Sequence, residues 1–385
     1  MRIFLSCQQA LKAHPVPAYA FWEYYLRSAL TEAGHEVVQA PDVDWAEGLM
    51  PLSAEQRAAW LDRTWTRTVD FIQAEHRRNP IRLFLGYLFP LQVEPSAVRT
   101  IRGAGVPTVN FFCDNVREFT EVPANFRDFD LHWVPEADAR SMYAAAGLKF
   151  VHLPMPMWVQ PRHRAVSEAE DESVIFVGSH DVLREDLLGE AVGKGVDVQI
   201  YGPGWLDSPQ DGAAAGPSKG RRWANQMEFL RKEGFRGLAL RATYQLRRMR
   251  PRDWIGQSAH PPLADEAYFK ATREAKVVIG INRCPSFRRS FSNPLRYSRL
   301  RDIEAPMLGA CYLTEMAPGL GDLYEVGAEI ETYRNAGELI EKAKQLKADP
   351  RKRLRLRQGG QRRALAHHTI EKSVARISRE LGIPE

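Results

Sequence analysis

The sequence has few cysteines and no long apolar run, and both scarcities narrow the classes of protein to which it can belong. Only four of the 385 residues are cysteine, and they are widely separated: Cys7, Cys113, Cys284 and Cys311. Neither a disulfide framework nor a zinc site is therefore expected. No apolar run approaches the roughly 20 residues that a membrane-spanning helix needs. The opening MRIFLSCQQALKAH turns polar too early for a secretory core, so it predicts the first strand of a cytoplasmic protein.

Several catalytic signatures are also missing. No GxGxxG follows the first apolar stretch, and GxxxxGKS/T occurs nowhere, which disfavours a dehydrogenase and a P-loop ATPase. HExxH and the EF-hand loop are absent as well, and the one GxSxG match, GPSKG at 216–220, lies in a stretch that predicts a flexible loop and not a strand-to-helix turn. The sequence therefore disfavours the readily recognised metal-dependent and serine-hydrolase classes.

The sequence does contain a repeated alternation of apolar, strand-like stretches with helical ones. The first series extends from MRIFLS to FVHLPM. A polar stretch rich in proline and charge, 159–173, is typical of a linker, and a second series begins after it with SVIFVG. Nearly continuous apolar strands indicate parallel sheets covered on both faces. We therefore predict an α/β chain with two Rossmann-like, doubly wound domains, 1–158 and 174–355. A C-terminal helix over 356–385 is expected to pack back toward the first domain.

Positive charge is concentrated in an insertion of the second domain, 206–256. The formal net charge is +5, yet residues 219–253 hold eleven Lys and Arg against three Asp and Glu, a local excess of eight. Aromatic and leucine side chains are interleaved with these arginines. The insertion could contact an anionic membrane surface or a phosphorylated acceptor. The plainer alternative is a solvated elaboration packed on its own domain, and nucleic acid is disfavoured because no known module is present.

Candidate binding residues follow the strands of the second domain. Ligands of doubly wound sheets bind at the carboxyl ends of the strands. Four predicted strands end at such residues, and we expect their loops to face one cleft: Gly178-Ser179-His180, Gly202-Pro203-Gly204, Asn282-Arg283 and Thr314-Glu315.

The stretch RLRDIEAPMLGACYLTE, residues 299–315, places Arg301 and Glu304 three residues apart on one predicted helix face. The plain interpretation is an intrahelical ion pair worth roughly 0.2 to 0.5 kcal/mol. In a binding site, the carboxylate could instead accept hydrogen bonds from a ribose while arginines neutralise a diphosphate. Pro306 predicts that the helix begins near Asp302 or kinks there.

Three segments together resemble a known family. They are FVGS with an arginine at 184, RLRDIEAPMLGACYLTE, and the stretch from GLGDLYEVG to ALAHHT. Their order resembles the C-terminal half of the spore-maturation-protein-like (CgeB-like) glycosyltransferases, relatives of glycosyltransferase family 4, over about residues 174–377. GVPTVNFFCDN and FDLHWVPEADARSMYAAAG carry a weaker similarity in the first half.

The resemblance implies a GT-B enzyme, with two Rossmann-like domains facing across a cleft and a nucleoside-diphosphate sugar held by the second domain without a metal or other cofactor. Glu304 would hold the ribose, and Arg301 with Arg184 would lie near the diphosphate. Gly178 and Ser179 would form the loop under the donor. The donor site would also include Asn282, Gly202 and Arg296. Arg296 stands where the family-4 E-x7-E signature has its first glutamate, which leaves the sugar and the stereochemistry open.

An inverting transfer would also need a general base from the first domain. Asp114, after VPTVNFFC, and His14, in the loop after the first strand, are the candidates by topology. The plain alternatives are a helix or turn cap for Asp114 and an ordinary loop residue for His14.

The function expected from the resemblance is transfer of a sugar, with a hexosyl unit favoured, to an unknown glycan, lipid-linked, protein or small-molecule acceptor. A role in cell-surface glycan biosynthesis at the inner face of the membrane would suit the basic insertion. Two alternatives keep the fold: a nucleotide-sugar epimerase or hydrolase-like enzyme, and a non-catalytic nucleotide-sugar-binding protein.

Overall fold

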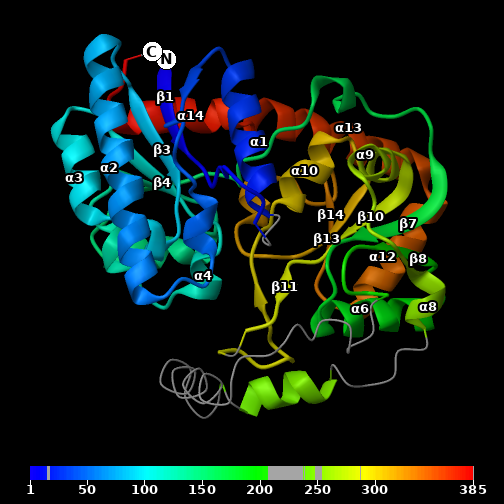
Figure 1. Cartoon of the computed structure of the whole chain (residues 1–385). Coiled ribbons are helices and arrows are strands. Elements are labelled where there is room, and N and C mark those ends of the chain that lie inside the picture. Colours follow the sequence, from blue (N-terminus) through cyan, green and yellow to red (C-terminus); the bar gives the residue numbers. More distant parts are fainter. Residues whose placement is uncertain (15–17, 207–236, 238, 248–253, 287, 385) are drawn as a thin grey trace. The chain divides into compact units, whose positions relative to one another are not determined.

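The computed structural model describes residues 1–14, 18–206, 237, 239–247, 254–286 and 288–384. The chain divides into two compact units, one made of Met1–Gln160 with Ala364–Glu385 and the other of Pro161–Arg363. Each unit contains a six-stranded sheet whose strands all run parallel (Figure 1). The prediction of two parallel-sheet α/β units is therefore confirmed.

The first unit has the strand order β2-β1-β3-β4-β5-β6. The strands LFLGY, TVNF and LHWV are buried at every position and are rich in apolar residues, as expected for a parallel sheet. The strands are Arg2–Ser6 (β1), Glu36–Val38 (β2), Leu83–Tyr87 (β3), Thr108–Phe111 (β4), Leu131–Val134 (β5) and Phe150–His152 (β6). The α-helices are Ala18–Glu32 (α1), Ala54–Arg78 (α2), Pro95–Gly103 (α3), Asn115–Glu118 (α4), Arg140–Ala145 (α5) and Ile370–Leu381 (α14).

The second unit has the strand order β14-β13-β10-β7-β8-β9, with a separate antiparallel ribbon of β11 and β12. Its strands are Asp171–Val177 (β7), Val198–Tyr201 (β8), Ala259–His260 (β9), Ala275–Gly280 (β10), Arg283–Cys284 (β11), Leu295–Arg296 (β12), Tyr312–Glu315 (β13) and Glu331–Tyr333 (β14). Its α-helices are Val182–Gly193 (α6), Ile255–Ser258 (α8), Asp265–Glu274 (α9), Arg301–Met307 (α10), Leu320–Leu323 (α11), Ala336–Ala348 (α12) and most of Pro350–His367 (α13). The core lies between the sheet and α6, α8 and α12.

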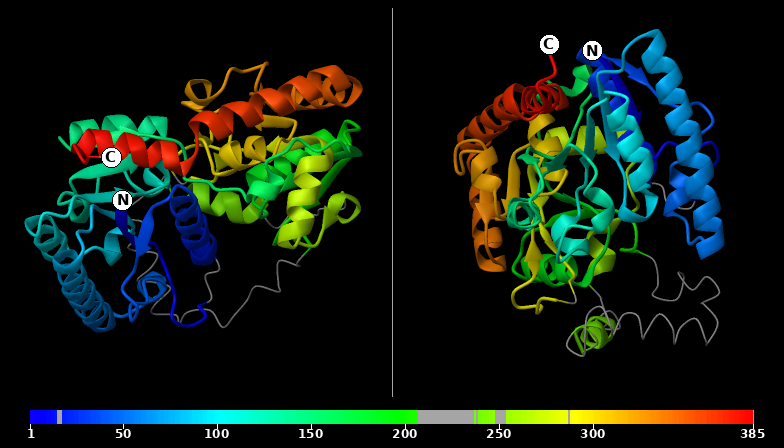
Figure 2. Two further views of the ribbon diagram at one scale, coloured as in Figure 1. Left: turned by 90° about the horizontal axis from the view of Figure 1, so that it is seen from above. Right: turned by 90° about the vertical axis from the view of Figure 1, so that its left-hand side faces the viewer.

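The C-terminal segment forms two helices where one was expected. The first, α13, ends at His367, and the Thr369 side chain accepts a hydrogen bond from the Lys372 amide to begin α14. In the second unit, Arg357 of α13 donates to the carbonyl of Gly309 at 3.0 Å. Residues 364–385 belong to the first unit, where α14 packs against α1 and the two chain ends lie close together (Figure 2).

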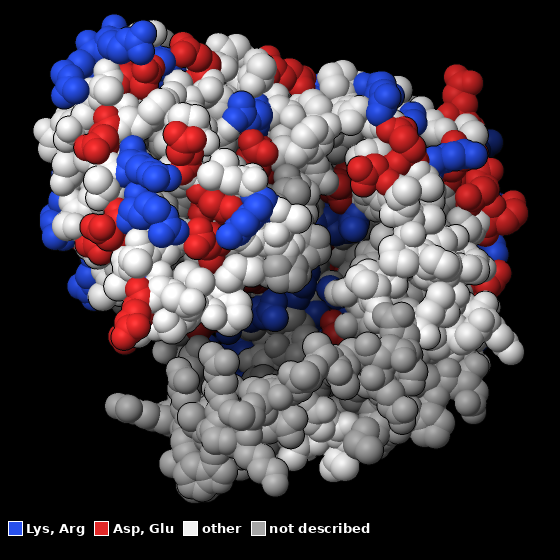
Figure 3. Space-filling model, viewed as in Figure 1, with Lys and Arg blue, Asp and Glu red and all other residues white. Residues whose placement is uncertain are grey.

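The basic insertion lies mostly outside the described residues, so the predicted membrane or acceptor contact of 219–253 lies outside them too. On the face drawn in Figure 3, acidic and basic side chains are interspersed over the described surface. Within the described part of the chain, no helix is long and apolar enough to cross a membrane. The four cysteines are buried, and none forms a disulfide bond among the described residues.

Candidate functional site

The polar loops of the second unit meet where its sheet changes winding direction. From β7 the chain proceeds to β8 and β9 on one side, and then returns to β10 on the other side of β7. Such a switch point is where doubly wound sheets bind ligands. The loops that start at Gly178 and Ile281, just after β7 and β10, therefore flank the expected binding position.

The loops after β7 and β8 are packed backbone against backbone. The Gly178 amide donates to the Tyr201 carbonyl at 2.8 Å, and the Trp205 indole donates to the Gly178 carbonyl at 2.8 Å. Gly202 has a φ of +148°, and a Cβ there would lie 2.2 Å from the Gly178 oxygen. Only glycine fits this position without displacing the loop under the predicted donor.

Arg184 lies in the first turn of α6 and folds back over that loop. Its Nη1 donates to the carbonyl and the hydroxyl oxygen of Ser179, at 2.7 and 3.1 Å. The carboxylate of Asp181, which also caps α6, lies 3.1 Å from Nε of Arg184. Burial lowers the pKa of Arg184, and the charge of Arg299 acts in the same direction. The predicted loop residues Gly178, Ser179 and Arg184 are thus brought together.

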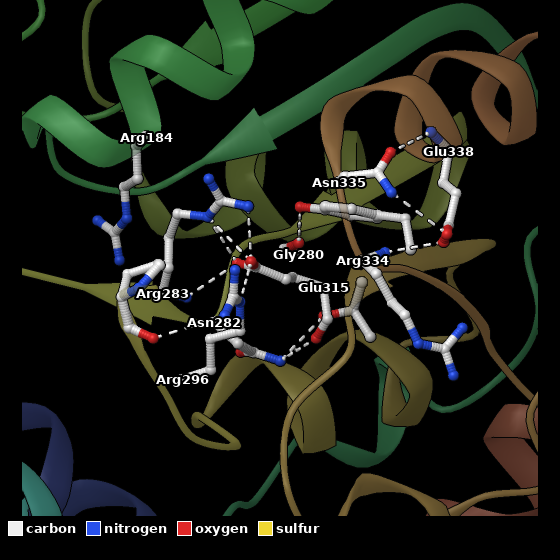
Figure 4. Close-up of polar contacts among 12 residues, drawn as sticks. Arg184, Gly280, Asn282, Arg283, Arg296, Glu315, Arg334, Asn335 and Glu338 are labelled. Atoms are coloured by element: carbon white, nitrogen blue, oxygen red, sulfur yellow. Dashed lines mark hydrogen bonds and ion pairs between the residues drawn. The ribbon is translucent and has the colours of Figure 1, made fainter. Parts of the chain in front are cut away.

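A second group of basic side chains gathers around Glu315 at the end of β13 (Figure 4). The carboxylate accepts from Nε and Nη2 of Arg283, with closest distances of 2.9 and 2.7 Å, and from Nε of Arg296 at 2.6 Å. Asn282 donates its amide to the carbonyl of Glu315 at 2.8 Å. The predicted residues Asn282 and Arg296 therefore lie in one cluster, which Glu315 organises.

Glu304 is buried in α10, and Arg301 and Tyr268 are among the partners of its carboxylate. Oε2 accepts from Nη1 of Arg301 at 2.6 Å and from the hydroxyl of Tyr268 at 2.7 Å. The Arg301 guanidinium also lies 4.6 Å from the centre of the Tyr268 ring. The intrahelical ion pair is therefore present, with a tyrosine added to it. The helix begins at Arg301 and includes Pro306.

Asp302 fixes the start of α10 and was not among the predicted site residues. Its buried carboxylate accepts from the hydroxyls of Tyr312 and Thr314, at 2.8 and 2.9 Å, and from the Arg299 amide at 3.1 Å. Burial raises the pKa of Asp302. By tying the helix to β13, this carboxylate determines where Arg301 points. Two of its partners lie 10 and 12 residues away, and no local pattern in the sequence indicates these contacts.

The two predicted bases of the first unit have different surroundings. His14 is buried, and its Nε2 lies 3.0 Å from both carboxylate oxygens of Asp44. Asp114 stands at the end of β4, at the N-cap position of α4, but its side chain makes no capping hydrogen bond there. It is partly exposed, and Arg117 lies 4.0 Å away. Asp114 is therefore the better placed of the two to meet a substrate.

A buried acid that the sequence did not single out lies beside Asp114. Glu136 accepts from the backbone amide and the side-chain amide of Asn115, at 2.6 and 2.7 Å. Tyr143 in turn donates to the Asn115 side-chain oxygen at 2.9 Å. Burial raises the pKa of Glu136 to about 7, and the charge of Asp114 adds to the effect.

Comparison with known proteins identifies the family of this chain. A family model described as "Glycosyl transferase-like" matches residues 184–379, just over half of the chain. The chain belongs to this glycosyl transferase-like family. No curated protein matches it.

Several glycosyltransferases of known structure share the fold of this chain over almost its whole length. Sucrose-phosphate synthase from Thermosynechococcus elongatus has a TM-score of 0.56 at 14% identity, covering 99% of this chain and 98% of its own. AviGT4, a glycosyltransferase involved in avilamycin A biosynthesis, has a TM-score of 0.53 at 14% identity, with coverages of 98% and 96%. HepE from Anabaena, solved with UDP-glucose, has a TM-score of 0.53 at 12% identity, with coverages of 99% and 99%. The fold is GT-B, as predicted.

Proposed function

We propose that this glycosyltransferase moves a sugar from a nucleoside-diphosphate sugar to an acceptor, and that it binds the donor at the strand ends of the second unit. The observation that carries the proposal is the set of basic side chains at this edge of the sheet: Arg184 folded over the Ser179 loop, and Arg283 with Arg296 at Glu315. Negative charge builds on the departing diphosphate as the glycosidic bond breaks, and a fixed guanidinium group such as that of Arg184 can stabilise it in place of a metal ion.

Within this site we assign the diphosphate to Arg184 and Ser179. The Ser179 hydroxyl and the guanidinium lie at the amino end of α6, where the helix dipole also favours an anion. Gly178 and Gly202 keep side chains out of the way of the donor. Asn282, between this loop and Glu315, completes the floor of the site.

We assign the ribose to Glu304, with Arg301 next to the diphosphate. The Glu304 carboxylate is held in place by Arg301 and Tyr268, and an ionised carboxylate is a suitable acceptor for a ribose hydroxyl. The donor class is supported by HepE, which was solved with UDP and UDP-glucose, and a hexosyl unit is proposed on the same ground. In the first unit, Asp114 is the proposed general base.

The test is a thermal-shift panel with uridine, guanosine, thymidine and cytidine diphosphates and their sugars. A donor at a hundredfold excess over its Kd should stabilise the protein by about 2.7 kcal/mol. Glu304→Gln should remove most of this stabilisation while the ligand-free protein stays folded. Glu172→Gln, at an exposed glutamate of the same unit, is the matched control and should keep the full shift. Equal shifts in both variants would remove Glu304 from the site, and no shift with any ligand would refute the donor site.

A further inference from the structure

The ribbon of β11 and β12 places two arginines face to face. Arg283 and Arg296 are direct partners in its antiparallel register. Like charges opposite one another on neighbouring strands destabilise the pairing. Both guanidinium groups therefore turn to one carboxylate, that of Glu315, and share its Oε1 at 2.7 and 2.6 Å (Figure 4).

This arrangement leaves one positive charge in excess in a place with little access to water. The side chains of Arg283, Arg296 and Glu315 are 13%, 26% and 0% exposed. Among the described residues, no second carboxylate lies within ion-pair distance of either arginine. Asp181 attracts Arg283 only from farther away and is itself paired with Arg184. An uncompensated charge in such surroundings is costly, so the pair is suited to an anion from solution.

Each guanidinium also keeps an unused donor group. Arg283 bonds Glu315 through Nε and Nη2, and Arg296 uses Nε for Glu315 and Nη1 for a long contact to the Pro294 carbonyl. In the described part of the chain, Nη1 of Arg283 and Nη2 of Arg296 donate to nothing. Each of these groups can donate a charge-assisted hydrogen bond to an oxygen of a carboxylate.

We propose that Arg283 and Arg296 bind a carboxylate on the transferred sugar, so that the donor is a nucleotide-activated acidic sugar such as a hexuronic acid. This inference rests on the proposed function. The diphosphate is assigned to Ser179 of the β7 loop and to Arg184 in the first turn of α6, and the paired arginines follow the adjacent strand, β10. Neighbouring strands lie about 4.8 Å apart, so both positions are within the length of one donor molecule.

Matched donors that differ only in the carboxylate test the proposal. Binding of UDP-glucose and UDP-glucuronate, UDP-galactose and UDP-galacturonate, and GDP-mannose and GDP-mannuronate is measured by calorimetry, beside UDP and GDP alone. In at least one of these three pairs, the wild-type protein should bind the donor that carries the carboxylate at least tenfold more tightly than its neutral counterpart. Arg296→Gln should abolish this preference while changing the Kd of the bare nucleoside diphosphate less than about threefold. Arg296→Lys, which keeps the charge, should retain part of the preference.

The controls separate this proposal from the donor site itself. Arg296→Gln leaves Glu315 paired one-to-one with Arg283, so circular dichroism should show a folded protein. Arg162→Gln, at an exposed arginine of the same unit, should bind every ligand as the wild type does. Equal affinity for acidic and neutral donors would overturn the proposal, as would an equal loss of nucleoside diphosphate binding in Arg296→Gln. In both cases the proposed function would stand. If no nucleotide or donor bound the wild type, both would fail.

Discussion

Glu315 and Glu136 are both fully buried, yet they meet opposite electrostatic surroundings. Glu315 accepts hydrogen bonds from two guanidinium groups. Glu136 faces the neutral amides of Asn115, and burial is the main influence on its carboxyl group. The Glu315 carboxylate therefore holds two cations in position for a ligand. The buried surroundings of Glu136, in contrast, disfavour the ionised form of its carboxyl group.

This contrast predicts a pH-dependent stability of the first unit. The pKa of Glu136 is raised from 4.5 to about 7 in the folded state. Its contribution to stability is therefore fully present below pH 4.5 and is lost as the pH rises through 7. Relative to Glu136→Gln, which cannot ionise, the wild type should lose about 3 kcal/mol of unfolding free energy between pH 4.5 and pH 8.

Urea unfolding of both proteins at several pH values measures this difference. Carboxylates with lowered pKa values, such as Glu75, are present in both proteins and cancel in the comparison. Parallel pH profiles for the two proteins would show that Glu136 has an ordinary pKa.

Individual residues also show which contacts could be predicted from the sequence and which could not. Arg301 and Glu304 could be paired in advance because they are three residues apart on a helix. Apart from the Arg299 amide at Asp302, the partners of Asp302, Glu315 and Glu136 are separated from them by 10 to 32 residues and come together only when neighbouring strands are aligned. Short spacing encodes local pairs, whereas these contacts depend on the register of the sheet.

At the scale of elements, eleven strands were predictable because each lies in a short, mainly apolar run bounded by glycine, proline or polar residues, whereas the two-residue strand β9 was missed. The division of the C-terminal segment into α13 and α14 was not, because Thr369 and its capping hydrogen bond interrupt a continuous helical pattern. The separate ribbon of β11 and β12 was also missed, since two-residue strands carry no periodic signal.

The contact between the β7 and β8 loops predicts a strong effect of Gly202→Ala. The new methyl group would lie 2.2 Å from the Gly178 oxygen, on a backbone with φ of +148°. Strain of this kind costs about 1 to 3 kcal/mol, and relief would displace Gly178 from beneath the donor. The variant should therefore lose both unfolding free energy and donor-induced thermal shift. Gly256→Ala, in α8 with nothing within 4 Å of the new atom, should be neutral or slightly stabilising. Similar results for both variants would contradict the assigned role of the loop.

At the scale of the whole molecule, the first unit is built from two distant parts of the sequence. Residues 1–160 supply the sheet, and residues 364–385 supply α14. Ile370, Val374 and Ile377 form a buried stripe along that helix, at the spacing of one helical face. Each such side chain contributes roughly 1.5 to 3 kcal/mol when it is buried, and the sum is comparable with the 5 to 15 kcal/mol that stabilises a typical domain.

Truncation after Arg363 should therefore unfold the first unit and spare the second. Limited proteolysis with mass mapping should show cleavage within 1–160 at least tenfold faster than in the full chain. The fragment 161–363 should persist, because it keeps Arg353, Arg357 and the other α13 contacts of its own unit. It should also keep the donor-induced thermal shift, since every residue assigned to the donor lies within it. Truncation after Ile383 retains α14 and is the control. Equal cleavage of both units after removal of 364–385 would show that their stabilities are coupled and that α14 supports more than the first sheet.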